Sequence, residues 1–171
     1  MKFLRYLPLM LLTVLSTAIT ACGDDDDKDE PQTEPSANIN TLTFTGTTVS
    51  FPVTGDDDNP DFSTTESVYT VRLDRQTRTC VIEIEHPRFL ATMPANLGTM
   101  VFSGVPFTFT DDNGYEFKIA ELIPQIAGTP YPAFKVSAIK GEYDGDTNTF
   151  ELEFTCDRFS RSVEFHGTPR R

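Results

Sequence analysis

Tryptophan is absent from this chain of 171 residues, and histidine occurs only twice. Without tryptophan the usual stacking platform for a sugar ring is missing, so glycan binding would depend on tyrosine. His86 and His166 are not spaced as ligands in one short motif. The two cysteines beyond the first 30 residues, Cys80 and Cys156, cannot form a structural zinc site alone. No Ser-His-Asp or Cys-His arrangement can be assembled either. These absences predict a protein that is not an enzyme and that holds no metal or cofactor.

Basic residues are also scarce. The chain has 14 lysines and arginines against 26 aspartates and glutamates, which gives a formal net charge of −12. Such a surface repels the phosphates of nucleic acids and anionic lipids. The composition therefore excludes nucleic acid as a partner, and it is compatible with a soluble domain at a cell surface.

A long apolar run occurs only at the start of the chain. Lys2 and Arg5 precede an almost wholly apolar stretch over residues 7–19. This stretch is too short to span a membrane, and its positive flank is typical of an export signal. The run leads into Ile19-Thr20-Ala21-Cys22, so we expect residues 1–21 to be a signal peptide.

The four residues at the end of this run resemble the lipobox of bacterial lipoproteins. In that family an aliphatic residue and two small residues precede a cysteine that is lipidated after cleavage in front of it. The resemblance implies that Cys22 carries acyl chains such as palmitate and anchors the protein to a membrane. The alternative is an ordinary signal peptide that is followed by a cysteine by chance.

An acidic segment follows Cys22. Residues 23–30 contain five aspartates and one glutamate, and they resemble the export signal of Bacteroidetes surface lipoproteins. The resemblance implies an outer-membrane protein at the cell surface, with the periplasmic face as the alternative. A solvated charge run is the plainer interpretation of the same residues. We expect residues 22–38 to be a flexible tether and residues 39–171 to form a single domain.

Apolar residues alternate with polar ones along most of that domain, which is the pattern of half-buried β-strands. The pattern predicts a strand within residues 41–53 and seven more at residues 69–73, 80–84, 105–109, 115–119, 134–143, 150–156 and 163–167. The alternation predicts that Phe109, Phe134 and Ala138 face inward, together with the other alternate apolar residues of their strands. Short polar turns separate the strands, and Asn113-Gly114 is suited to one of them because asparagine and glycine accept positive φ.

About eight antiparallel strands with short connections favour an all-β meander that closes into a small barrel. A two-sheet β-sandwich is the alternative. The hairpin spacing and the ending at residues 163–168 resemble the calycin-like (lipocalin-like) domains of Bacteroidetes lipoproteins. This resemblance implies a barrel that could enclose a ligand. The Gly-x-Trp signature of true lipocalins is absent, so no binding residue can be transferred.

Several groups of acidic residues are candidates for a catalytic or cation-binding site. Glu83 with Glu85, and Glu151 with Glu153, share a strand face but point toward solvent. Residues 144–148 begin like a calcium-binding EF-hand loop, but the glycine and the final glutamate of that loop are missing. Residues 56–61 form a denser acidic loop that could hold a cation weakly. We expect the paired glutamates to belong to a solvated face of the sheet. We expect residues 144–148 to form a hairpin turn and residues 56–61 to form a mobile loop.

The two remaining cysteines, Cys80 and Cys156, both fall on inward positions of their strands. A disulfide between them is one alternative, since the compartment beyond the inner membrane permits it. Two buried thiols that behave as small apolar groups are the other.

Two long, partly apolar connections break the strand pattern, at residues 87–100 and 120–133. Such loops often cover a barrel end or make contacts. We expect Leu122, Ile123, Ile126 and Tyr131 to line a mouth or a partner surface, and a loop tucked onto the core is the alternative. The function predicted from the sequence is a surface lipoprotein that binds a small apolar ligand or a partner protein. The alternative is a structural or adhesive component without a ligand cavity.

Overall fold

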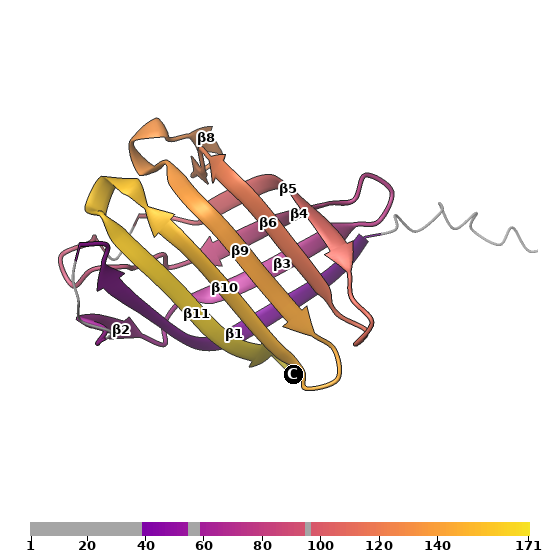
Figure 1. Cartoon of the computed structure of the whole chain (residues 1–171). Helices are drawn as coiled ribbons and strands as arrows, with labels where there is room; N and C mark the ends of the chain where they lie inside the picture. Colours follow the sequence, from indigo (N-terminus) through magenta and orange to yellow (C-terminus); the bar gives the residue numbers. More distant parts are fainter. Residues whose placement is uncertain (1–38, 55–58, 95–96) are drawn as a thin grey trace, which may run out of the picture. The chain divides into compact units, whose positions relative to one another are not determined.

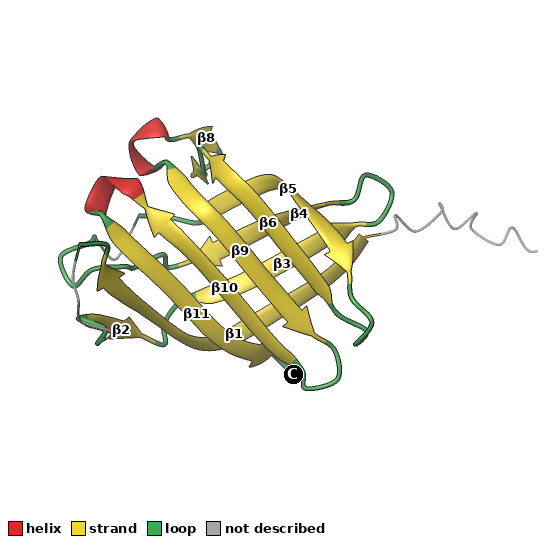
Figure 2. Cartoon of the chain, viewed as in Figure 1, coloured by secondary structure: helices red, strands yellow, loops and turns green. Residues whose placement is uncertain are grey.

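A computed structural model describes residues 39–54, 59–94 and 97–171 (Figure 1). These residues form almost only β-structure, with two short 3₁₀ helices (Figure 2). The elements in chain order are β1 (Ile39–Pro52), β2 (Phe62–Thr64), β3 (Val68–Asp74), β4 (Thr79–Glu85), β5 (Met100–Phe109), β6 (Tyr115–Leu122), β7 (Gln125–Ile126), β8 (Thr129–Pro130), η1 (Pro132–Phe134), β9 (Val136–Asp144), β10 (Thr149–Cys156), η2 (Asp157–Phe159) and β11 (Arg161–Pro169).

Eight of the strands close into an antiparallel barrel. β1, β3, β4, β5, β6, β9, β10 and β11 each pair with the next in that order, and β11 pairs back onto β1. β2 adds to the side of β1, and the small hairpin of β7 and β8 adds to β5. The predicted meander and barrel are therefore confirmed, and each of the eight predicted strands corresponds to one strand of the barrel.

The interior is filled by the alternating inward side chains, many of them aromatic. The ring of Phe44 stacks on Phe150 with 4.2 Å between centroids, and Tyr69 stacks on Phe165 at 3.9 Å. Phe154 contacts Phe102 edge to face at 5.3 Å. Each of these rings is at most 2 % exposed. The centre of the barrel is thus a packed core.

The two ends of the barrel differ. One end, the turn end, carries the tight hairpin turns after β3, β5 and β9. The described chain begins at the same end, because Ile39 pairs with Asp74. The other end, the loop end, carries residues 86–94, 97–99 and 123–135 and both 3₁₀ helices (Figure 1).

A buried plug closes the loop end. Phe89, from the first long connection, is fully buried and contacts Phe154 edge to face at 5.2 Å. The hydroxyl of Ser50 donates a hydrogen bond of 2.6 Å to the carbonyl of Phe89. The hydroxyl of Ser67 donates one of 2.9 Å to the carbonyl of His86, just after β4 ends. The first long connection thus folds over this end of the barrel.

Two bulges change which residues face inward. In β9, Val136 and Ile139 are both buried although they are three positions apart, and Ala138 between them is exposed with a φ of +53°. In β5, Gly104 has a φ of +71° at the corresponding irregularity in its pairing with β4. A bulge inserts one residue and shifts the alternation of faces. The prediction that Ala138 faces inward was therefore wrong.

Two phenylalanines also depart from the predicted alternation. Phe134 is buried, but it belongs to η1 and not to a strand. Phe109 is 45 % exposed at the turn end. The guanidinium groups of Arg75 and Arg78 each lie 5.4 Å from its ring centroid. Cation–π contact on the surface takes the place of burial for this ring.

Two hairpin turns share a sequence motif that the sequence analysis missed. Residues 74–79 and 144–149 both contain aspartate, threonine and threonine at the first, fourth and sixth positions. The carboxylate of Asp144 accepts hydrogen bonds from the backbone N–H groups of Asp146 and Thr147 at 2.8 and 3.0 Å. Asp74 does the same for Gln76 and Thr77. The segment that begins like an EF-hand is therefore a hairpin turn, as expected.

Candidate functional site

The loop end carries a surface that contains a small pocket with an aromatic lining. We call this area the loop-end surface. Its pocket has a volume of about 250 Å³. The described residues that line it include Met93 and Leu97 from the first long connection, Tyr131 and Phe134 at η1, and Arg158 and Phe159 at η2. The chain thus brings three separate segments together at this end.

Polar contacts tie η1 to η2 and hold this surface in place. The backbone N–H of Asp157 donates to the carbonyl of Lys135 at 3.2 Å, and the hydroxyl of Ser137 donates to the Asp157 carboxylate at 2.7 Å. The Lys135 ammonium lies 2.9 Å from the carboxylate of Glu121 and 3.5 Å from that of Asp157. The hydrogen bond to Glu121 raises the pKa of Lys135 above its usual value.

Arg158 supplies a positive charge to the loop-end surface. Its guanidinium carbon lies 5.4 Å from the ring centroid of Phe134 and 5.9 Å from that of Phe159. Among the residues that the structure describes, no carboxylate forms an ion pair with it. The charge is therefore free to meet an acidic group of a partner.

The four residues predicted to line a mouth or partner surface are divided between two environments. Leu122 and Ile126 are partly buried against the core. Ile123 and Tyr131 are 50 % and 43 % exposed. The two exposed residues belong to one local structure, because the backbone N–H of Tyr131 donates to the carbonyl of Pro124 at 2.8 Å. Tyr131 lines the loop-end pocket, whereas Leu122 and Ile126 pack against the barrel core.

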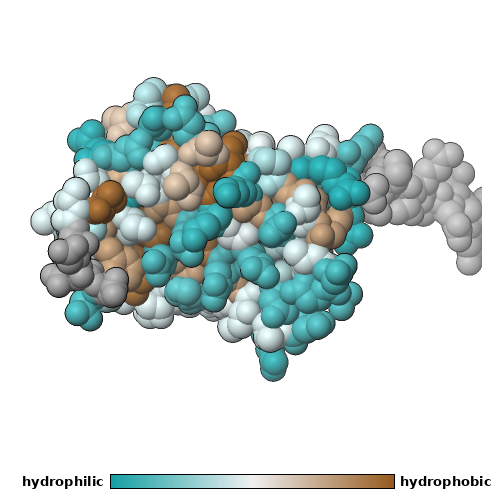
Figure 3. All heavy atoms as spheres, in the orientation of Figure 1, coloured by the Kyte–Doolittle hydropathy of each residue, from teal (hydrophilic) through white to brown (hydrophobic). Residues whose placement is uncertain are grey.

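Exposed apolar side chains continue beyond this pocket. Val53 is 51 % exposed, and its backbone N–H donates to the carbonyl of Ser160 directly after η2. Figure 3 shows that brown, hydrophobic spheres gather over the half of the visible face that includes the loop end. The opposite lower corner is mainly teal.

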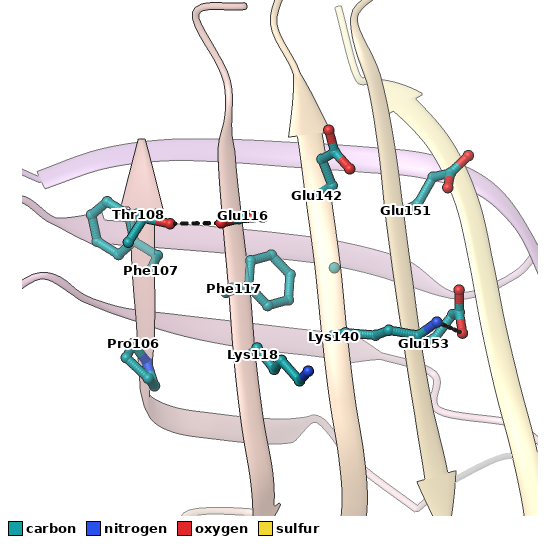
Figure 4. A pocket seen from close by; sticks show the side chains of 11 residues that line it. Pro106, Phe107, Thr108, Glu116, Phe117, Lys118, Lys140, Glu142, Glu151 and Glu153 are labelled. Atoms are coloured by element: carbon teal, nitrogen blue, oxygen red, sulfur yellow. Dashed lines mark hydrogen bonds and ion pairs between the residues drawn. The ribbon is translucent and has the colours of Figure 1, made fainter. Parts of the chain in front are cut away.

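A larger groove, which was not predicted from the sequence, lies on the outer wall of the barrel. Its volume is about 560 Å³. It crosses four neighbouring strands, and its lining consists of residues 106–108, 116–118 and 140–142 together with Glu151 and Glu153 (Figure 4). We call it the outer-wall groove. Only the cross-strand register brings these residues together, so no local sequence signal could have revealed the groove.

Charged side chains form the sides of the outer-wall groove. Glu116 accepts a hydrogen bond from the hydroxyl of Thr108 at 3.1 Å, and Lys140 forms an ion pair of 2.7 Å with Glu153 (Figure 4). The hydrogen bond to Glu153 raises the pKa of Lys140 above its usual value. Phe107 and Phe117 contribute to the lining but are at least nine-tenths buried.

Several acidic candidates from the sequence have structural partners. Glu83 forms an ion pair with Arg72 at 2.6 Å, and Glu151 lies 3.2 Å from the ring of His166. Asp61 pairs with Arg161, while residues 56–58 of the same acidic loop lie outside the described residues. In the part of the chain that the structure describes, no group of three His, Cys, Asp or Glu side chains is placed to hold a metal ion.

Cys80 and Cys156 are free, buried thiols. Three strands separate β4 from β10 in either direction around the barrel, so the two cysteines lie on opposite walls. They also lie near opposite ends, because Cys80 follows the turn after β3 and Cys156 immediately precedes η2. A disulfide requires Cα atoms within about 7 Å of each other. Of the two alternatives, the structure has the unpaired one.

None of the helices in the described ranges has the length and apolarity needed to cross a membrane. No protein-family model matches the chain, and no curated protein matches it. Two solved structures show a weak likeness to this chain. One is a mutant of the vaccine antigen transferrin binding protein B from Actinobacillus pleuropneumoniae, with 9% identity and a TM-score of 0.42 over 76% of this chain. The other bears the description surface lipoprotein, with 11% identity and a TM-score of 0.42 over 78% of this chain.

The matched regions cover 61% and 62% of the lengths of those two proteins. At these identities and TM-scores, nothing is transferred from those proteins to this chain.

Proposed function

We propose that this protein is a non-enzymatic surface lipoprotein that binds a partner protein through its loop-end surface. The observation that carries the proposal is the exposure of Ile123 and Tyr131, 50 % and 43 %, beside a pocket with an aromatic lining. Exposed apolar groups of this kind commonly mark interaction sites.

A protein partner fits this surface better than a small apolar ligand does. The space in which a calycin-like barrel would hold a ligand is filled by stacked rings such as Phe44 on Phe150. The loop-end pocket, at about 250 Å³, is smaller than the usual range for small-molecule sites. Tyrosine, phenylalanine, methionine and arginine are the side chains that protein interfaces favour. The pocket is of a size to accept one side chain of a partner, with Arg158 available to an acidic neighbour.

The end of the barrel at which β1 begins supports the same proposal. The described chain begins at Ile39, at the turn end of the barrel. A lipid on Cys22 would hold the protein through that end, and the loop-end surface is at the opposite end of the barrel. A structural or adhesive role would use the same surface, and the packed interior favours either role over carriage of a ligand inside the barrel.

The binding proposal can be tested by site-specific photo-crosslinking on native cells. A photoreactive amino acid in place of Ile123 should form a crosslink to a distinct protein, and Tyr131→Ala in the same chain should abolish it. The matched control is a photoreactive amino acid in place of Phe109, which is 45 % exposed at the turn end. The same crosslinks from both positions, or none from position 123, would contradict the proposal. A small molecule of defined mass bound to the purified protein in native mass spectrometry would favour a ligand carrier instead.

The anchor is tested separately. Metabolic labelling with a palmitate analogue should label the wild-type protein and not the Cys22→Ser variant. Intact cells treated with an external protease should lose the domain if it is displayed on the surface. Protection from protease in intact cells, with digestion after the outer membrane is opened, would place the domain on the periplasmic side.

A further inference from the structure

The outer-wall groove contains charges of the same sign directly opposite each other on neighbouring strands. Glu116 of β6 lies opposite Glu142 of β9, and Glu142 lies opposite Glu151 of β10. One strand repeat away, Lys118 lies opposite Lys140. Like charges directly opposite in an antiparallel pair destabilise the sheet, and opposite charges stabilise it. These like-charge pairs are therefore expected to destabilise the barrel wall.

The cost is only partly relieved by neighbouring side chains. Glu116 is hydrogen-bonded to Thr108, Lys140 is paired with Glu153, and Glu151 lies beside His166. Among the described side chains, Glu142 and Lys118 form no hydrogen bond or ion pair with another side chain. In Figure 4 the carboxylate of Glu142 and the ammonium of Lys118 project into the groove without a dashed contact.

The negative and positive charges of the groove occupy different positions along the strands. On both β6 and β9 a glutamate lies nearer the turn end and a lysine lies nearer the loop end: Glu116 and Lys118 on β6, Glu142 and Lys140 on β9. The two rows are therefore separated by two residues of a strand, about 6.6–6.8 Å. The alternative is a solvated face without a ligand. That alternative explains the exposure of these residues, but it does not explain why the signs oppose the stability of the sheet.

We infer that the outer-wall groove binds an extended peptide segment of a protein, with a basic and an acidic side chain two positions apart. In an extended peptide such residues point to the same side and are separated by the same strand repeat as the two rows. The basic side chain would lie against the glutamate row, with Glu142 at its centre. The acidic side chain would lie against Lys118. This site is distinct from the loop-end surface, and the inference does not depend on the function proposed for that surface.

A charge-conserving swap separates binding from folding. In the double variant Glu116→Lys with Lys118→Glu, both like-charge pairs between β6 and β9 become opposite-charge pairs, and the net charge is unchanged. We expect this variant to have a higher melting temperature than the wild type. We also expect it to bind the peptide at least about tenfold more weakly, since its charges are then paired within the sheet.

The probe is a fluorescent peptide with blocked ends, acetyl-Ala-Lys-Ala-Glu-Ala-amide, titrated into the full chain in a neutral detergent and followed by fluorescence anisotropy. The control peptide, acetyl-Ala-Lys-Glu-Ala-Ala-amide, has the same composition but presents its charges on opposite sides. We expect the first peptide to bind more tightly and to lose affinity as salt is added.

Equal affinity for the two peptides, or no binding of either, would overturn the inference. So would equal binding of the first peptide to the wild type and to the swapped variant. The variant Tyr131→Ala should bind the first peptide as the wild type does, and this result distinguishes the groove from the loop-end surface. If the swapped variant fails to fold, the single variants Glu142→Gln and Lys118→Gln provide the same test, because each should weaken binding without disturbing the core.

Discussion

The ring of Phe117 packs against the backbone of Gly141 on the neighbouring strand, beneath the floor of the outer-wall groove. A Cβ atom on Gly141 would collide with Cζ of this ring and would lie 2.6 Å from the carbonyl oxygen of Glu151. The aromatic ring thus covers a glycine in an antiparallel sheet, a pairing that stabilises such positions.

This contact predicts the effect of Gly141→Ala. The added methyl group overpacks the wall, so the free energy of unfolding should fall by about 1–3 kcal/mol in urea denaturation. The combination with Phe117→Leu should recover part of that loss, because the shorter side chain leaves room. A neutral Gly141→Ala variant would show that the wall yields without cost.

The packed interior predicts an engineered cavity. Phe150 contacts Phe44, Phe117 and Phe165 with centroid separations of 4.2, 6.0 and 5.9 Å. Phe150→Ala should lower the free energy of unfolding by about 3–5 kcal/mol and leave an apolar void.

Benzene should raise the melting temperature of the Phe150→Ala variant, since dry apolar voids bind such molecules. It should leave the wild type unchanged. Phe150→Leu is the milder replacement if the alanine variant does not fold. A wild-type barrel that is itself stabilised by benzene would mean that its interior is not filled.

The buried thiols should be inert in the native protein. Burial raises the pKa of Cys80 to about 12 and that of Cys156 to about 11. Only the thiolate reacts with iodoacetamide, so at about pH 8 both residues should remain unmodified until the protein is unfolded. Peptide mass mapping before and after denaturation, without a reductant, measures this. A linked pair of peptides in that experiment would contradict the free thiols.

The turn aspartates should contribute to stability in a pH-dependent way. Hydrogen bonds from the side chain and backbone N–H of Thr147 hold the pKa of the Asp144 carboxyl below its usual range. A group whose folded pKa is depressed stabilises the protein above its unfolded pKa, and that contribution is lost as the pH falls through the folded pKa.

Asp144→Ala should therefore lower the melting temperature at about pH 7, and the difference from the wild type should shrink as the pH falls below about 4. Asp111→Ala is the control, because the exposed Asp111 carboxylate accepts no side-chain hydrogen bond among the described contacts. A difference that does not change with pH would show that the carboxylate charge is not involved.

The strands could be predicted because their signal is local. Phe150, Leu152 and Phe154 alternate with glutamate and threonine, and alternate residues of a strand point to opposite faces. The departures arose where another interaction outweighed that pattern. A bulge turned Ala138 outward, two arginines cover the exposed Phe109, and η1 removed Phe134 from its strand.

The candidate surfaces were predicted less completely. Ile123 and Tyr131 could be identified because apolar residues in a proline-containing loop stand out from the strand pattern. Their neighbours Arg158 and Phe159 could not, because they follow a different strand and reach the same pocket only through the closure of the barrel. The motif shared by residues 74–79 and 144–149 was visible in the sequence, but it describes turns and not a site.

By itself, the sequence determined the strands, most of their inward faces and the acidic surface, because each depends on residues close together in the chain. The export signal stays a prediction. Only the tertiary structure decided which residues face each other across strands. The register placed Glu116 beside Glu142 and Lys118 beside Lys140, and the closure of the barrel separated Cys80 from Cys156. Electrostatic repulsion and disulfide bonding depend on distance in space, and a chain that closes into a barrel sets those distances through its register.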